Sequence, residues 1–260
     1  MSTIDSFGKC ALLVAHPGHE IHVHGWLEKT RPVVYVLTDG SGRSGHARLA
    51  STTQLLARSG ARPGAIYGRL TDRALYNAVL RRDIALFRNL AAELADEMVR
   101  ERFDFVLGDA AEGEILAHDV WRGVVNAALA AAQRRMGSRI ASYAFTLEGP
   151  PGQCPAELAT EAVWRRLDDL ALARKIAAAR SYPELKAEVE AAIAAYGEDA
   201  FRLECLHPAS RQVHQGRDAI PHYERHGETL VAAGIYPETV RHERHVVPLL
   251  TELQREQRAA

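Results

Sequence analysis

Residues 10–20 read Cys-Ala-Leu-Leu-Val-Ala-His-Pro-Gly-His-Glu, and this stretch decides the fold class. Its apolar start, Cys10 to Val14, is typical of a buried strand, and Pro17-Gly18 predicts a turn directly after it. Two imidazoles, His16 and His19, therefore stand where the strand ends. Open α/β sheets bind ligands outside the carboxyl ends of their strands, and histidine is the commonest metal ligand. The stretch predicts half of a metal site at the mouth of a parallel sheet; the alternative is a helix-capping turn with two solvated histidines.

Apolar runs and helix-period segments alternate through the rest of the first 150 residues. We expect strands at 9–15, 32–37, 65–68, 103–107 and 139–145, and helical segments at 20–30, 47–59, 73–101 and 118–135. This alternation predicts a parallel sheet covered by helices through right-handed crossovers. We therefore expect a Rossmann-like, three-layer α/β domain over residues 1–150. The amino-acid composition changes after residue 150. The composition of residues 151–260 predicts a helical C-terminal extension packed on that domain.

The composition and net charge limit the kinds of binding partner that we expect for this chain. The chain has 260 residues and a formal net charge of -1, so no general attraction to nucleic acid or to an anionic membrane is expected. Its three cysteines form no CxxC pair, which argues against a thiolate zinc site. No basic leader or apolar run of transmembrane length is seen, so we expect a cytoplasmic protein acting on a small molecule. The sequence leaves open whether the chain forms a homo-oligomer.

The histidine pair needs a third ligand, and His118 is the best candidate. It follows the fourth expected strand and opens a helix on the same edge of the sheet. Catalytic zinc keeps three protein ligands and one open position, which His16, His19 and His118 would satisfy; the alternative for His118 is a solvated residue at a helix start. Glu114 and Asp119 are the candidates for the general base, although Asp119 can instead stabilise the helix terminus.

Other polar residues near these strand ends have candidate roles. Glu20 follows the metal turn and is a candidate ligand or an orienter of an imidazole. Asp39 ends the second strand, and Arg43 lies in the glycine-rich loop behind it; both are candidates for substrate contacts, and Arg43 is equally well explained as solvated. That loop has neither GxGxxG nor GKS/T, so a nucleotide is not indicated. A second metal site is a minor alternative for four C-terminal histidines, His222, His226, His242 and His245.

Two of these motifs resemble the PIG-L (LmbE-like) family. Its Ala-His-Pro-Asp-Asp-Glu motif stands here as Ala15 to Glu20, and its Leu-Thr-Asp-Gly motif as Leu37 to Gly40. The third motif, His-Pro-Asp-His, is partly present as Leu116 to Asp119, and the resemblance covers residues 10–145. It implies a zinc-dependent de-N-acetylase of N-acetylglucosamine-type sugars, with His16 and His118 as ligands.

This chain departs from the family at three positions. The family's general base is replaced by Gly18, its aspartate ligand by His19, and a further histidine by Ile115. The resemblance therefore implies one retained zinc and altered acid–base chemistry. We expect a zinc-dependent hydrolase that removes an N-acyl group, most simply acetyl, from an amino sugar or sugar-like conjugate. Two alternatives stay open: a catalytically silent relative that binds metal and ligand, and a non-haem iron(II) enzyme using the same histidine pair.

Overall fold

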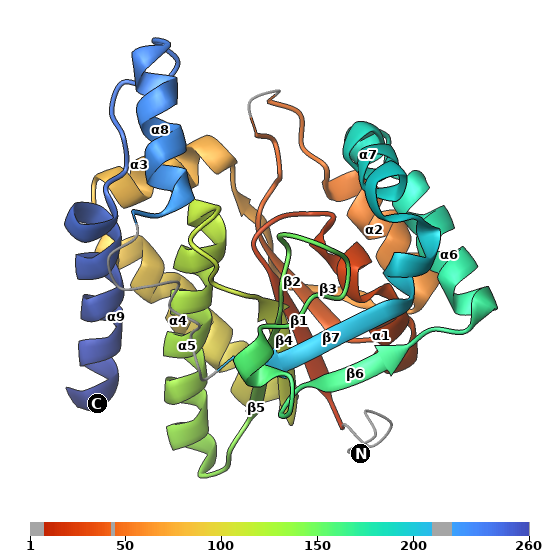
Figure 1. The fold of residues 1–260 in the computed structure, drawn as a ribbon. Helices are drawn as coiled ribbons and strands as arrows, with labels where there is room; N and C mark the ends of the chain where they lie inside the picture. Colours follow the sequence, from red (N-terminus) through yellow and green to blue (C-terminus); the bar gives the residue numbers. More distant parts are fainter. Residues whose placement is uncertain (1–7, 43–44, 210–219, 260) are drawn as a thin grey trace.

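A seven-stranded mixed sheet forms the centre of the molecule (Figure 1). The computed structural model describes residues 8–42, 45–209 and 220–259. The strands lie in the order β3-β2-β1-β4-β5-β7-β6. They span Cys10–Val14 (β1), Val33–Thr38 (β2), Arg62–Leu70 (β3), Phe105–Asp109 (β4), Ala141–Phe145 (β5), Val163–Arg166 (β6) and Leu203–Pro208 (β7). The first five run parallel to one another, which confirms the expected α/β class.

Helices cover both faces of this sheet, so the fold has three layers (Figure 1). One face carries α3 (Asp72–Leu80), α4 (Ile84–Glu101), α5 (Leu116–Met136), α8 (His222–Ala232) and α9 (Val247–Ala259). The other carries α1 (His24–Thr30), α2 (Leu49–Ser59), α6 (Asp169–Arg180) and α7 (Lys186–Tyr196). Among the described residues, no helix is long and apolar enough to cross a membrane.

The double coverage explains why β1 is apolar throughout. Ala11 and Leu13 belong to the core cluster on one face, whereas Leu12 and Val14 belong to the cluster on the other. A strand buried on both faces has no polar side to alternate with. The continuous run of residues 10–14 is therefore the expected signature of a central strand, and β1 does pair with β2 and β4.

The segment expected to be helical over residues 73–101 forms two helices. Arg82, between α3 and α4, has a φ of 50°, in the left-handed region. The side chain of Asp83 then accepts a hydrogen bond from Leu86 N at 3.1 Å and caps the start of α4. The apolar periodicity continues across this break, which is why the sequence pattern alone shows one long segment.

The segment after residue 150 contains helices, as expected, and also two strands that the sequence analysis missed. β7 pairs antiparallel with β5, and β6 pairs antiparallel with β7, so the sheet is mixed rather than wholly parallel. Both strands are short, and β6 alternates buried and accessible residues at the sheet edge. Residues 151–260 are therefore partly continuous with the central sheet; a domain division at residue 150 stays a prediction.

Candidate metal centre

His16 lies immediately beyond β1, at the point where the chain order of the sheet reverses. β1 pairs with β2 on one side and with β4 on the other, and a crevice forms outside such a switch point. His16 Nδ1 lies 2.7 Å from Thr38 Oγ1 and 3.1 Å from Asp72 Oδ1. Because the Thr38 hydroxyl donates to Ala15 O, it accepts from Nδ1–H. The lone pair of His16 is then on Nε2, and a carboxylate behind the ring is the usual support of a metal-binding histidine.

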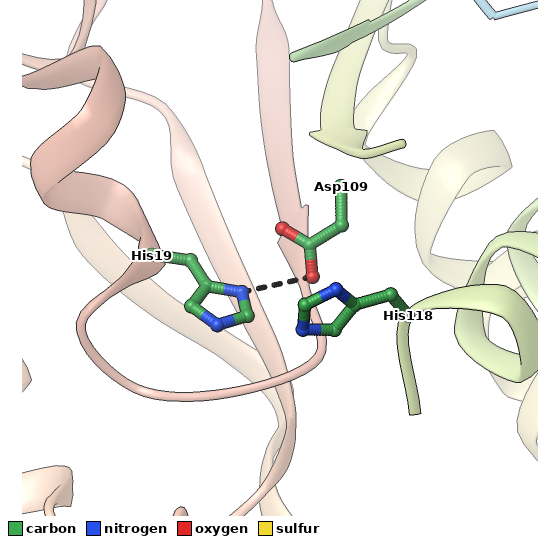
Figure 2. A group of neighbouring side chains, drawn as sticks. All are labelled: His19, Asp109 and His118. Atoms are coloured by element: carbon green, nitrogen blue, oxygen red, sulfur yellow. Dashed lines mark hydrogen bonds and ion pairs between the residues drawn. The ribbon is translucent and has the colours of Figure 1, made fainter. Parts of the chain in front are cut away.

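His19, Asp109 and His118 point toward one another (Figure 2). One potential ligand atom of each lies within 4.8 Å of the others. Asp109 ends β4, and its Oδ2 accepts from Ala15 N at 2.7 Å and lies 3.0 Å from His19 Nδ1. The ring centroid of His16 is 5.3 Å from that of His19 and 5.5 Å from that of His118. The three histidines expected to bind metal thus lie together, joined by a carboxylate that the sequence analysis had not assigned as a ligand.

The buried polar atoms of this group fit a bound cation. His118 is 1% exposed, yet within the part of the chain that the structure describes neither of its ring nitrogens has a hydrogen-bond partner, and Asp109 Oδ1 has none either. Buried polar atoms without partners are rare and call for a ligand, ion or water. Imidazole nitrogen and carboxylate oxygen are the donors that zinc takes in catalytic sites. The donor set therefore suits a divalent metal, and its identity stays a prediction.

Burial and neighbouring charges set the protonation of these groups. Burial holds the pKa of His118 well below its ordinary value, which keeps the imidazole neutral. Burial opposes ionisation of Asp109, but the neighbouring His19 and His118 and the hydrogen bond from Ala15 N together lower the pKa of the carboxyl. Arg122 supports the same residue from the other side, because its Nε donates to the Asp109 carbonyl oxygen at 2.8 Å. A neutral imidazole and an ionised carboxylate are the forms that coordinate a metal.

Glu20 is wholly buried, and both oxygens of its carboxylate have partners within the protein. Its carboxylate accepts from Gly18 N at 2.9 Å and from the hydroxyl of Tyr182 by a short hydrogen bond. Gly18 has a φ of 103°, which the turn between the two histidines requires. Glu20 thus fixes the conformation of the metal turn. The role expected for it, ligation or orientation of an imidazole, stays a prediction.

The glycine-rich loop after β2 is tied to the metal centre through Asp72 rather than Asp39. Asp39 accepts from Ser41 N at 3.0 Å and holds its own loop. Asp72, the first residue of α3, accepts from Gly42 N at 2.5 Å while contacting His16. The sequence analysis missed Asp72, because nothing in its local pattern marks it. Arg43 lies outside the described residues.

The two candidate bases lie in the loop and first turn that present His118. Asp119 accepts from Gly113 N at 3.1 Å, and burial raises its pKa to about 6. Glu114 Oε2 lies 3.1 Å from His222 Nδ1 of α8. Both carboxylates thus have partners outside the group of His19, Asp109 and His118. Their catalytic role stays a prediction.

The C-terminal histidines do not gather into a metal-binding group among the residues described. His222 and His226 stack with their ring centroids 5.9 Å apart on α8. His242 Nδ1 lies 2.5 Å from the hydroxyl of Tyr223, and His245 Nδ1 accepts from Arg241 N. Internal hydrogen bonds thus account for the ring nitrogens of His242 and His245 that face the protein.

Comparison with known proteins shows the fold. No protein-family model matches the chain, and no curated protein matches it either. A deacetylase–bog complex from the biosynthesis pathway of teicoplanin has a TM-score of 0.52 at 12% identity, covering 82% of this chain and all of that one (100%). A deacetylase triple mutant from the same pathway has a TM-score of 0.51 at 12% identity, covering 77% of this chain and 97% of that one. The α/β fold implied by the resemblance is therefore confirmed.

Proposed function

We propose that this chain is a metal-dependent hydrolase that removes an N-acyl group from an amino sugar or a sugar-like conjugate. The observation that carries the proposal is the buried His118 beside Asp109 and His19: its ring nitrogens have no hydrogen-bond partner among residues 8–42, 45–209 and 220–259. The group lies at the carboxyl edge of a parallel sheet, where such folds bind substrates. The similar structures in the comparison are deacetylases, which supports amide hydrolysis as the reaction class.

His19, Asp109 and His118 would hold the metal, with His16 Nε2 as a further donor from the same turn. A zinc ion bound there supplies a Lewis acid for the amide carbonyl and lowers the pKa of water. Thr38 and Asp72 fix the ring of His16 in one tautomer, and Ala15 N holds the carboxylate of Asp109. We assign the general-base role, which is to take the proton from the attacking water, to Glu114 or Asp119. Both residues lie on the loop and helix turn that carry His118.

Metal analysis of variants tests the site. We expect one zinc per purified chain and its loss in His118→Ala, since the remaining ligands bind weakly. His222→Ala is the matched control, because His222 lies outside the group and contacts Glu114. His19→Asp restores the ligand type of the resembled family and should keep the metal. Retention of one zinc per chain in both His16→Ala and His118→Ala would refute the proposed site.

Amine release tests the reaction. Wild-type protein should release free amine from at least one N-acylated sugar, and replacing the correct base by its amide should slow turnover by roughly 10²–10⁴ with metal retained. Glu114→Gln and Asp119→Asn are the two variants to compare. No release from any N-acyl sugar by the metal-loaded protein would favour a silent binding relative.

Iron(II) is the second candidate for the metal, and one observation favours considering it. His19, His118 and Asp109 are two histidines and one carboxylate, the donor set of non-haem iron oxygenases. An iron enzyme would need oxygen for turnover, whereas hydrolysis would not. Equal amine release in air and under nitrogen supports hydrolysis.

A further inference from the structure

Helix α7 presents an apolar stripe that the protein core covers only in part. Leu185 precedes its first residue, and Val189, Ala192 and Ile193 follow at helical spacing on the same side. None of the residues of α7 is buried. Apolar side chains on one face of a helix normally pack against a core. Leu185 and Ile193 do so in part, and the accessible remainder of the stripe borders a space that a ligand can fill.

That space is a cavity of about 290 Å³ between the metal centre and the two helices α6 and α7. Ile176 and Ala179 of α6 and the stripe of α7 form much of its wall. Gly18 and His19 of the metal turn line the same cavity. A ligand in this cavity therefore lies directly beside a candidate metal ligand.

The charged groups in the deep wall are already satisfied by the protein. Lys175 Nζ donates to Glu204 Oε1 at 3.0 Å and to His22 O at 2.7 Å. The Glu204 carboxylate also accepts from Gly25 N at 2.8 Å and from Trp26 N at 2.9 Å, at the start of α1. These groups have little capacity left for a polar ligand, so the surface that α6 and α7 offer is apolar apart from the exposed Glu188.

A polar group is available at the end of the cavity next to the metal turn. Arg48 lines the cavity, and its buried Nε has no hydrogen-bond partner among the described residues. Arg48 Nε and Pro17 Cδ lie against the same backbone position, Gly40. The cavity thus pairs a polar end at the metal turn with an apolar end at α7.

We propose that this cavity binds the acyl chain of the substrate, and that the chain is longer than acetyl. This inference rests on the proposed function, since it specifies the acyl group of the same amide. A water molecule takes about 30 Å³ and a methylene group is of similar size, so a cavity of about 290 Å³ has room for a chain of up to roughly nine carbons. The sugar lies toward Arg48 and the metal turn, and the chain lies along Val189 and Ile193.

Binding and turnover of two probes test the assignment separately. Isothermal titration measures binding of N-octanoylglucosamine and N-acetylglucosamine, and amine release is followed for both. Each buried methylene contributes about fourfold in affinity, so partial burial of the longer chain should make the octanoyl probe bind at least about 30-fold tighter.

Tryptophan variants on one helix locate the chain. Ala192→Trp should fill the cavity and bring the octanoyl probe down to the affinity of the acetyl probe, and Val189→Trp is a second variant with the same expected effect. Ala194→Trp is the matched control, because Ala194 is an exposed residue of α7 outside the cavity. Thermal melts verify that each variant is folded.

The outcomes distinguish the two proposals. Equal affinity of both probes for the wild type, or equal effects of Ala192→Trp and Ala194→Trp, would overturn the acyl cavity even if amine is released. Tight octanoyl binding that only the cavity-filling variants abolish supports the acyl cavity, and if no amine is then released, the proposed hydrolysis fails while the cavity assignment stands.

Discussion

Replacing Gly18 by alanine should destabilise the protein by about 2–3 kcal/mol. The backbone there has a φ of 103°, and a non-glycine residue held in a left-handed conformation costs about 1–2 kcal/mol. A Cβ at this position would stand 2.5 Å from Leu185 Cδ1, closer than real contacts. Because that atom is the end of a flexible, half-buried side chain that can turn aside, we assign this contact about 1 kcal/mol, at the low end for overpacking.

Urea unfolding of three further variants separates the two contributions. Gly137→Ala is the matched control, because Gly137 has a φ of 65° with nothing within 4 Å of a Cβ; it should cost only the backbone part. The other two variants are Leu185→Ala and the double variant Gly18→Ala/Leu185→Ala. Removing the Leu185 side chain should recover the roughly 1 kcal/mol lost to its contact with the new Cβ, which appears as a coupling of about 1 kcal/mol in the double-mutant cycle. Equal costs for Gly18→Ala and Gly137→Ala, with coupling below about 0.5 kcal/mol, would refute the reasoning.

Three further predictions concern stability and are measured by urea unfolding. Lys175→Met should cost about 3–5 kcal/mol, because Glu204 would stay buried without its cation; a cost below about 1 kcal/mol would contradict this. Asp83→Ala should cost about 1 kcal/mol through loss of the cap of α4, with an unchanged m-value as the check on two-state unfolding. Burial raises the pKa of Glu112 to about 7 from 4.5, so between these two pH values the folded state keeps a proton that the unfolded state has lost. The free energy of unfolding should therefore fall as the pH rises across that interval. Glu112→Gln should flatten this dependence on pH, and an unchanged dependence would show that another group titrates.

The sequence was most informative where burial leaves little choice. Central strands covered on both faces must be continuously apolar, so β1, β2 and β4 were predicted close to their observed bounds. The helical segments around them followed from periodicity. The proximity of His16, His19 and His118 was predicted from the sequence, because parallel strands place their carboxyl ends at one edge of the sheet.

The missed residues depend on contacts between distant parts of the chain. Asp72 reaches His16 from the start of α3 across the sheet edge, and Asp109 meets His19 from a different strand. Neither contact has a local pattern, although the position of Asp109 at the end of a central strand was a usable signal. The antiparallel strands β6 and β7 were missed for a related reason: their pairing partners lie far away in the sequence, and the composition around them is that of helices.

The antiparallel insertion of β7 between β5 and β6 has a consequence for the order of folding. β6 leaves the ribosome before β7, yet among the described residues β7 is the strand with which it pairs. Helix α6 depends on the same strand, because Lys175 of α6 forms its ion pair with Glu204 of β7. Non-local contacts of this kind form late and slowly. The parallel core of β1, β2 and β4 can assemble during synthesis. The part formed by β6, β7 and α6 is completed only after residue 208 has emerged from the ribosome. A nascent chain stopped before β7 would therefore expose an apolar surface to which chaperones can bind.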